Sequence, residues 1–267
     1  MKRIKKLSQF IEDWLIKYIK KSKMDGFVIG VSGGIDSAVT STICARTGYP
    51  TLCLEMGIHQ NIAQVSKARK HIQWLEENYK NVSHHSLSLT KLFDEFCFTL
   101  PNGIDSNKKN LALANSRARL RMTTLYYFST INNYLVAGTG NKVEDFGIGF
   151  YTKYGDGGVD ISPIADLMKS EVFVLARHLN VIEDIQNSNP TDGLWDDDRT
   201  DEDQIGASYE EIEFVMKSIE MKSKEILNSR QEEVLKLYKN LNTKNKHKMS
   251  PIPVCKVPKA LKNSIEF

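Results

Sequence analysis

The stretch FVIGVSGGIDS, residues 27–37, decides how the rest of the chain is interpreted. Its apolar first half predicts a short buried strand, and the residues from Asp36 to about Arg46 predict a helix directly behind it. Adjacent glycines in between permit a tight turn with positive φ and let a ligand approach the backbone closely. Such a turn favours an anion, because the amides that open the helix point at it and the helix dipole attracts negative charge.

The segments around this stretch repeat the alternation of strand and helix. An amphipathic helix carrying apolar residues from Leu7 to Ile19 precedes it. Further strands are expected at 51–56, 82–87 and 134–137, helices at 61–78, 110–131 and 164–179, polar loops at 102–109 and 195–206, and two or three helices at the C-terminus. This order predicts an α/β fold, a doubly wound parallel sheet with flanking helices, in one domain over residues 1–267. In such sheets ligands bind beyond the carboxyl ends of the strands.

Composition narrows the function classes. The chain has 267 residues, 41% of them hydrophobic, and a formal net charge of +3, so neither a nucleic-acid partner nor a membrane partner is expected. Lysines gather near both ends, where solvated termini are the simplest explanation. The N-terminus has neither a signal-peptide nor a membrane-span pattern. Four scattered cysteines without a CxxC pair indicate reduced, packed thiols, and a cytoplasmic location is expected.

The SGGxDS string at residues 32–37 carries the first resemblance. It is not a Walker A loop, since no Gly-Lys-Ser/Thr follows, and two glycines alone would fit an ordinary turn. The full string after an apolar strand resembles the pyrophosphate loop of enzymes that cleave ATP between its α and β phosphates. These include GMP synthetase, asparagine synthetase, argininosuccinate synthetase, tRNA thiolases and NAD synthetase. The resemblance implies a Rossmann-like, adenine nucleotide alpha hydrolase-like fold.

Further motifs distinguish between these enzymes. They are NSRARLRM at 115–122, GTGNKVE at 138–144, TKYGDGGVDI at 152–161, LMKSEV at 167–172, PTDGLW at 190–195, TDED at 200–203 and His-Lys at 247–248. In this order and spacing they resemble the ammonia-dependent NAD synthetase family, from Gly26 to about Lys248. TKYGDG is the sharpest single match.

The resemblance implies three sets of site residues. ATP would be held by Gly30, Val31, Ser32, Gly33, Gly34, Ile35, Asp36, Ser37, Thr139, Lys169 and Thr191. Asp36 and Glu144 would bind Mg²⁺, with Asp36 and Lys169 catalytic. Deamido-NAD would be bound by Arg119, Lys153, Asp160, His247 and Lys248. Each has a structural alternative: a surface helix charge for Arg119, a solvated lysine for Lys169, a loop acid for Glu144, a turn cap for Asp160 and a basic tail for His247 and Lys248.

The implied chemistry is amide formation on deamido-NAD. The nicotinate carboxylate would attack the α-phosphate of ATP, and ammonia would then displace AMP from the acyl-adenylate, giving NAD, AMP and diphosphate. The chain leaves no room for an amidotransferase domain, so free ammonia, or ammonia from a partner, is the expected nitrogen source. The polar loops are candidate lids. The family also implies a homodimer, for which the helix at 110–131 and the N-terminal helix offer surfaces.

One departure keeps alternatives open. Residues 55–61 read EMGIHQN, without the proline usual in the family near the adenine pocket, although Gln60 keeps its place. An amide ligase acting on another carboxylate is therefore one alternative. A tRNA sulfur-transfer enzyme is a second, although it needs reactive cysteines. A nucleotide-binding regulatory module without turnover is a third, against which the acid pair Asp36 and Glu144 argues.

Overall fold

The computed structural model describes residues 2–60, 62–101, 106–188, 200–222 and 226–262. Within these ranges one sheet has four strands, all parallel, in the order β3-β2-β1-β4. The strands are β1 (Gly26–Gly30), β2 (Thr51–Gly57), β3 (Val82–Ser88) and β4 (Tyr134–Val136). Phe27 stands beside Thr51 on one side and Leu135 on the other. The predicted parallel α/β sheet is confirmed.

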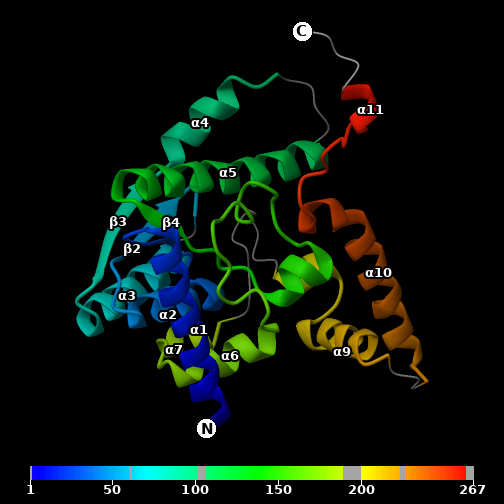
Figure 1. Ribbon diagram of the computed structural model, residues 1–267, viewed down its shortest axis with the longest axis horizontal. Helices are drawn as coiled ribbons and strands as arrows, with labels where there is room; N and C mark the ends of the chain where they lie inside the picture. Colours follow the sequence, from blue (N-terminus) through cyan, green and yellow to red (C-terminus); the bar gives the residue numbers. More distant parts are fainter. Residues whose placement is uncertain (1, 61, 102–105, 189–199, 223–225, 263–267) are drawn as a thin grey trace.

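Helices cover both faces of the sheet (Figure 1). They are α1 (Lys2–Ser22), α2 (Ile35–Arg46), α3 (Ile62–Asn78), α4 (Thr90–Phe98), α5 (Ser106–Asn132), α6 (Lys169–His178), α7 (Glu183–Gln186), α8 (Asp201–Ile205), α9 (Tyr209–Glu220), α10 (Ser229–Met249) and α11 (Lys259–Lys262). A π-helix, η1 (Val143–Ile148), follows β4. In Figure 1, α5 runs along one side of the sheet, whereas α9 and α10 lie beyond it.

The side chains of β1 alternate between two hydrophobic cores. Phe27 and Ile29 pack in the core that α1, α2 and α6 build on one face of the sheet. Val28 packs in the other core, where Leu125 of α5 and neighbouring apolar residues cover the sheet. Because successive strand residues point to opposite faces, a strand buried on both sides must be apolar throughout. The uninterrupted apolar run of β1 therefore follows from its central position.

Some expected boundaries were wrong. The helix expected over 164–179 begins only at Lys169, because residues 163–167 form turns whose Ile164 and Leu167 point into the core. The segment expected as a loop up to Gly206 contains α8, whose start is capped by the Thr200 side chain accepting from Asp203 N–H. Helix α5 begins at Ser106, inside the other expected loop, and α4 was not expected. Residues 102–105 and 195–199 lie outside the described ranges.

The topology gives one place where a ligand site is expected. Strands β1 and β4 are neighbours, so the turn after β1 and the segment after β4 leave the sheet at the same edge. Ala137 forms a parallel bridge with Ile161, and Gly138 N–H donates to Ile161 O at 2.7 Å, which ties the later loop to this edge. Such a switch in strand order opens a crevice at the carboxyl ends of the strands.

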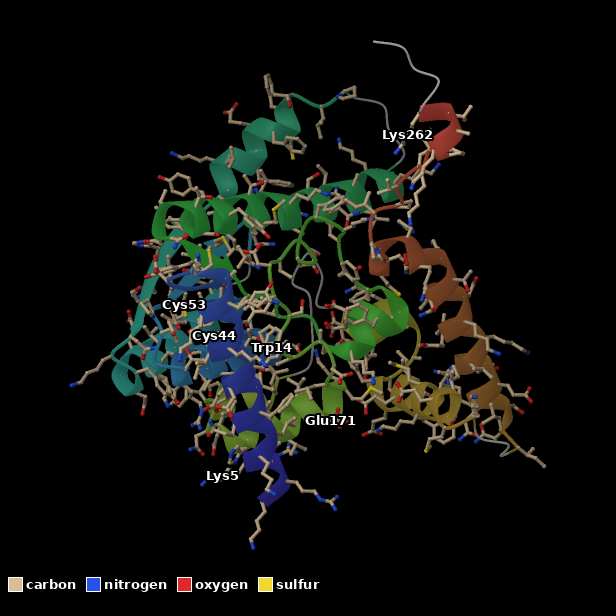
Figure 2. The ribbon with its side chains drawn as sticks, in the orientation of Figure 1. Lys5, Trp14, Cys44, Cys53, Glu171 and Lys262 are labelled. Carbon is tan, nitrogen blue, oxygen red and sulfur yellow. The ribbon has the colours of Figure 1, made fainter. Side chains whose placement is uncertain are left out.

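The two termini lie apart, and the predicted packing of the cysteines holds for Cys44 and Cys53 but not for the exposed Cys255. Figure 2 shows Lys5 and Lys262 at opposite ends of the molecule, so the lysines near the two termini do not form one patch. Cys44 and Cys53 are buried between α2 and the sheet, and all four cysteines are free thiols. Among the described helices, none combines the length and apolar character needed to cross a membrane.

Candidate active site

The turn after β1 is held by hydrogen bonds within itself. Ser37 Oγ donates to Gly34 O at 2.9 Å and accepts from Ser32 N–H at 3.2 Å, while Gly34 N–H donates to Ser32 Oγ at 3.2 Å. Gly33 has a φ of 86°, a left-handed conformation that glycine adopts without strain. Directly behind the turn begins α2, a helix of 12 residues. The predicted strand, turn and helix therefore present a preorganised helix N-terminus at the switch point.

A lysine and two carboxylates meet beside this turn. Lys169 Nζ lies 2.6 Å from Asp36 Oδ2 and 2.9 Å from Glu144 Oε1. The lysine side chain is 4% exposed and each carboxylate 16%. The three residues come from the first turn of α2, the start of η1 and the first position of α6. A buried ammonium thus offsets one of the two negative charges that these close acids carry.

Asn141 joins the parts of this cluster. Its Nδ2 donates to Asp36 Oδ1 at 3.1 Å, and its Oδ1 accepts from Val143 N–H at 3.1 Å and Glu144 N–H at 3.2 Å. The side chain is fully buried and caps the start of η1. One amide therefore fixes the backbone that carries Glu144 against the helix that carries Asp36. Asn141 lies inside the GTGNKVE motif, but motif comparison alone gave it no role.

The electrostatics of the cluster follow from burial and pairing. Burial raises the pKa of Asp36, and the nearby Glu144 adds to the rise against the opposing charge of Lys169. Burial acts the same way on Glu144, but Lys169 and a hydrogen bond from Tyr209 outweigh it and lower the pKa of Glu144. The two carboxylates raise the pKa of Lys169 in spite of its own burial. The lysine is therefore charged at any physiological pH.

Further acids gather around the cluster. Burial and the charges of Glu144 and Asp156 raise the pKa of Asp145 well above its usual value. Loss of hydration raises the pKa of Asp156 to about 6, although part of the residue remains exposed and Thr152 N–H donates to it at 2.9 Å. Such an accumulation of carboxyl groups favours a bound cation. No group of three or more His, Cys, Asp or Glu side chains in the described ranges is arranged to hold a metal by itself.

A cavity of about 290 Å³ connects these features. The predicted ATP residues that line it are Gly30, Val31, Ser32, Gly33, Gly34, Ile35, Asp36, Ser37, Thr139 and Lys169, together with the predicted metal ligand Glu144. Asp145 and Asp156 line it as well. Thr191, the remaining predicted ATP residue, lies outside the described ranges. The structure therefore brings together, in one cavity, residues that motif comparison assigned to one nucleotide.

The end of β2 forms another part of the cavity wall. Met56 and Gln60 line it, and Arg121 holds both, since its Nε donates to Met56 O at 3.0 Å and its Nη2 to Gln60 Oε1 at 3.1 Å. This is the segment whose sequence departs from the family near the predicted adenine pocket. Of the arginines in NSRARLRM, Arg121 reaches the cavity, while Arg117 lies over the Phe93 ring at 4.5 Å.

The predicted deamido-NAD residues do not line this cavity. Most of them instead form a series of hydrogen bonds. Arg119 Nη2 donates to Lys153 O at 3.3 Å, and Lys153 Nζ donates to His247 O at 2.8 Å. Lys248 Nζ donates to Gly149 O and Tyr151 O at 2.8 and 2.7 Å. These hydrogen bonds join α5 and α10 to the loop after η1.

Asp160 has hydrogen-bond partners outside this series of contacts. Its Oδ1 accepts from Tyr126 OH at 3.0 Å and its Oδ2 from Val136 N–H at 2.8 Å, so both carboxylate oxygens brace α5 and β4. Together with Trp14 and Tyr18 of α1 it lines a second, more open hollow. The hydrogen bonds of Asp160 therefore go to other residues than those of the four residues with which the resemblance grouped it.

Residues 7–252 match the family model of NAD synthase. The chain belongs to the NAD synthase family. An NH3-dependent NAD synthetase of Carboxydothermus hydrogenoformans is 38% identical over 206 residues, which cover 76% of this chain and 82% of the relative. The family match and the identity to this relative are sequence comparisons and do not use the cavity geometry.

Solved structures of the NAD synthase family repeat the fold. An NMN synthetase from Francisella tularensis superposes with a TM-score of 0.83 and 31% identity, covering 95% of this chain and 99% of that one. An NH3-dependent NAD synthetase from Campylobacter jejuni, in complex with nitrate, gives a TM-score of 0.76 and 28% identity with the same coverage. The family fold is thus found over nearly the whole chain. The names of these two neighbours give different products, NMN for one and NAD for the other.

Proposed function

We propose that this chain is an ammonia-dependent NAD synthetase that converts deamido-NAD, ATP and ammonia into NAD, AMP and diphosphate. Its family makes it a ligase of NAD biosynthesis. The observation that carries the proposal is the single cavity in which the turn at residues 30–37, the acids Asp36 and Glu144, and Lys169 meet. A polyphosphate needs donors and positive charge, and the cavity supplies both.

ATP is proposed to place its phosphates on the turn and the N-terminus of α2. The backbone amides that open α2 and the hydroxyl of Ser32 are the proposed donors there, since the Ser37 hydroxyl already donates to Gly34 O. Asp36 and Glu144 fit Mg²⁺, because both are carboxylates on the cavity wall and Mg²⁺ in nucleotide sites is held by one or two carboxylates plus phosphates. Bound there, the ion would neutralise phosphate charge.

The proposed reaction begins when the nicotinate carboxylate attacks the α-phosphate and diphosphate leaves. Ammonia then attacks the acyl carbon, and AMP leaves with the bonding electron pair. Lys169 and the turn amides offset the charge that develops on the phosphoryl oxygens. The apolar parts of the cavity wall, such as Val31 and Leu125, keep water from the acyl-adenylate.

The chemistry requires no protein nucleophile, and the thiols agree with this. Burial raises the pKa of Cys44, and it raises that of Cys53 to about 12, so neither is a reactive thiolate. For these two thiols, this weighs against the sulfur-transfer alternative, whereas Cys97 is half-buried and Cys255 exposed. The same free thiols support a cytoplasmic location as part of the proposal.

A second candidate substrate is nicotinate mononucleotide, whose amidation gives NMN. It is favoured by the structural similarity to the Francisella NMN synthetase. Both candidates share the ATP chemistry and differ only in what is attached to the nicotinate ribose phosphate.

One assay separates the candidates. The protein is incubated with ATP, Mg²⁺, an ammonium salt and either deamido-NAD or nicotinate mononucleotide, and the products are identified by mass. We expect deamido-NAD to lose one oxygen and gain NH, with one AMP formed per amide. If nicotinate mononucleotide is turned over faster than deamido-NAD, it replaces deamido-NAD as the proposed substrate. AMP formation without either amide would contradict the proposal. An inactive Asp36→Ala variant with an unchanged circular dichroism spectrum is the control.

A homodimer is also part of the proposal. Exposed apolar side chains stand on the two helices expected to form it, with Phe10 on α1 69% exposed and Tyr127 and Ile131 on α5 62% and 59%. Light scattering checks this expectation, and a strict monomer at working concentration would contradict it.

A further inference from the structure

Tyr209, the first residue of α9, is a buried side chain to which sequence motifs gave no role. It is 6% exposed, and its backbone is fixed on both sides. Its N–H donates to Glu202 Oε1 at 2.8 Å, and the preceding Ser208 accepts from Glu211 N–H in a capping box. The ring therefore enters the active-site cluster from a rigid helix start.

Two groups of the cluster contact Tyr209. Its hydroxyl donates to Glu144 Oε1 at 2.6 Å, and Asp201 Oδ2 lies 3.2 Å from the same hydroxyl. The Lys169 ammonium lies 4.8 Å from the centre of its ring. A phenol thus supplies a donor to one member of the cluster and a π face to another.

Tyr209 and Lys169 donate to the same oxygen of Glu144. Both Tyr209 OH and Lys169 Nζ bind Oε1, and neither binds Oε2. Donors that share one oxygen fix the orientation of the carboxylate, and neither of them competes with another ligand for Oε2. The Asn141 side chain also contributes a hydrogen bond to this carboxylate. If Lys169 contacted a phosphate instead, Tyr209 would still hold Oε1.

The same face of α9 also holds the helix that carries Lys169. Glu213, one turn after Tyr209, accepts from Ser170 N–H at 2.8 Å and from Ser170 Oγ at 2.6 Å. Residues four apart lie on one helix face, so α9 fixes Glu144 and the start of α6 together. This arrangement argues against a chance contact of a single hydroxyl.

We propose that Tyr209 is a positioning residue whose hydroxyl holds the Glu144 carboxylate in the orientation in which it takes up the divalent cation of the nucleotide. The proposal rests on the proposed function, since it assumes that Mg²⁺ and ATP bind in this cavity. Tyr209 itself needs no contact with substrate.

Calorimetric titration with α,β-methylene ATP tests the proposal, in Mg²⁺ and in EDTA. Tyr209→Phe keeps the ring and removes the hydroxyl. We expect it to weaken binding in Mg²⁺ about tenfold, with little change in EDTA, because one hydrogen bond to a charged group is lost. Raising Mg²⁺ should restore binding. Tyr238→Phe is the matched control: Tyr238 packs against the same hydrophobic cluster, so it should bind like wild type.

A double-mutant cycle adds a readout that a structural role would not give. In a Glu144→Ala background, Tyr209→Phe should have no further effect on binding in Mg²⁺. An equal loss with and without Mg²⁺, or an undiminished loss in the Glu144→Ala background, would overturn the positioning role. If wild type binds the analogue normally and Tyr209→Phe binds it equally well, the positioning role is overturned while the proposed function stands. A wild-type protein that does not bind the analogue in Mg²⁺ would refute the proposed function as well.

Discussion

Replacing Lys169 by methionine removes the charge that holds two carboxylates together. The ammonium lies 2.6 and 2.9 Å from Asp36 and Glu144, and the three side chains are only 4%, 16% and 16% exposed. Methionine keeps most of the length of the side chain but leaves two partly buried acids facing each other. Breaking a buried ion pair in this way costs about 3–5 kcal/mol. For a chain of this size, that loss corresponds to a drop in Tm of roughly 6–20 °C at neutral pH.

The pH dependence of this loss identifies its cause. Without Lys169 the pKa values of both acids rise above those of the unfolded chain, which lie near 4. An acid whose pKa is raised on folding destabilises the folded state as pH rises above the unfolded value. The Lys169→Met protein should therefore approach wild-type stability as pH falls toward 4. Millimolar Mg²⁺ should raise its Tm more than that of wild type, because the cation replaces the missing charge.

Differential scanning calorimetry between pH 4 and 8, with and without Mg²⁺, measures these effects. The matched control is Lys142→Met, since Lys142 also lies between two acids, 3.4 Å from Asp166 and 3.0 Å from Glu220, but at the surface. It should lose at most about 1 kcal/mol. Activity of Lys169→Met should fall at least about 100-fold. Equal stability of Lys169→Met and wild type at pH 7, or a deficit that does not shrink as pH falls, would refute the reasoning.

Three further predictions test other parts of the structure. Burial lowers the pKa of His71 to about 4, so wild type should lose about 3 kcal/mol as pH falls from 6.5 to 4, and His71→Phe should abolish that loss in urea titrations across this range. Leu15→Ala, in a fully buried position of α1, should cost about 2–5 kcal/mol by urea denaturation, whereas Phe98→Ser at an 87% exposed position of α4 should cost less than about 0.5. Gly140→Ala would drive a Cβ into both carboxylate oxygens of Asp145, so the Asp145 side chain or the loop must shift and AMP formation should fall at least about tenfold; wild-type rates would show that this contact relaxes freely.

The sequence by itself determined the parts of this protein that depend on near neighbours. The apolar run, the glycine pair and the helix that follows are local patterns, so the strand and turn at residues 27–37 were predicted as they are found. The family was likewise recognisable from motifs, and the family match confirms it. Local patterns misplaced the start of α6 because apolar spacing at Ile164 and Leu167 reflects burial of turn residues in the core and not a helical period.

Only the tertiary structure decided how the candidate site is assembled. Lys169 pairs with Asp36 across 133 positions of sequence, and Tyr209 reaches Glu144 across 65. It is also the tertiary structure that gives Asp160 a different hydrogen-bond partner, Tyr126, from the one that Arg119 has in Lys153. The roles of these residues stay predictions until binding is measured. Motifs and periodicity encode what each segment forms, whereas distances between segments follow from strand order and from which helix faces pack together, and these are set by the buried contacts of the whole fold.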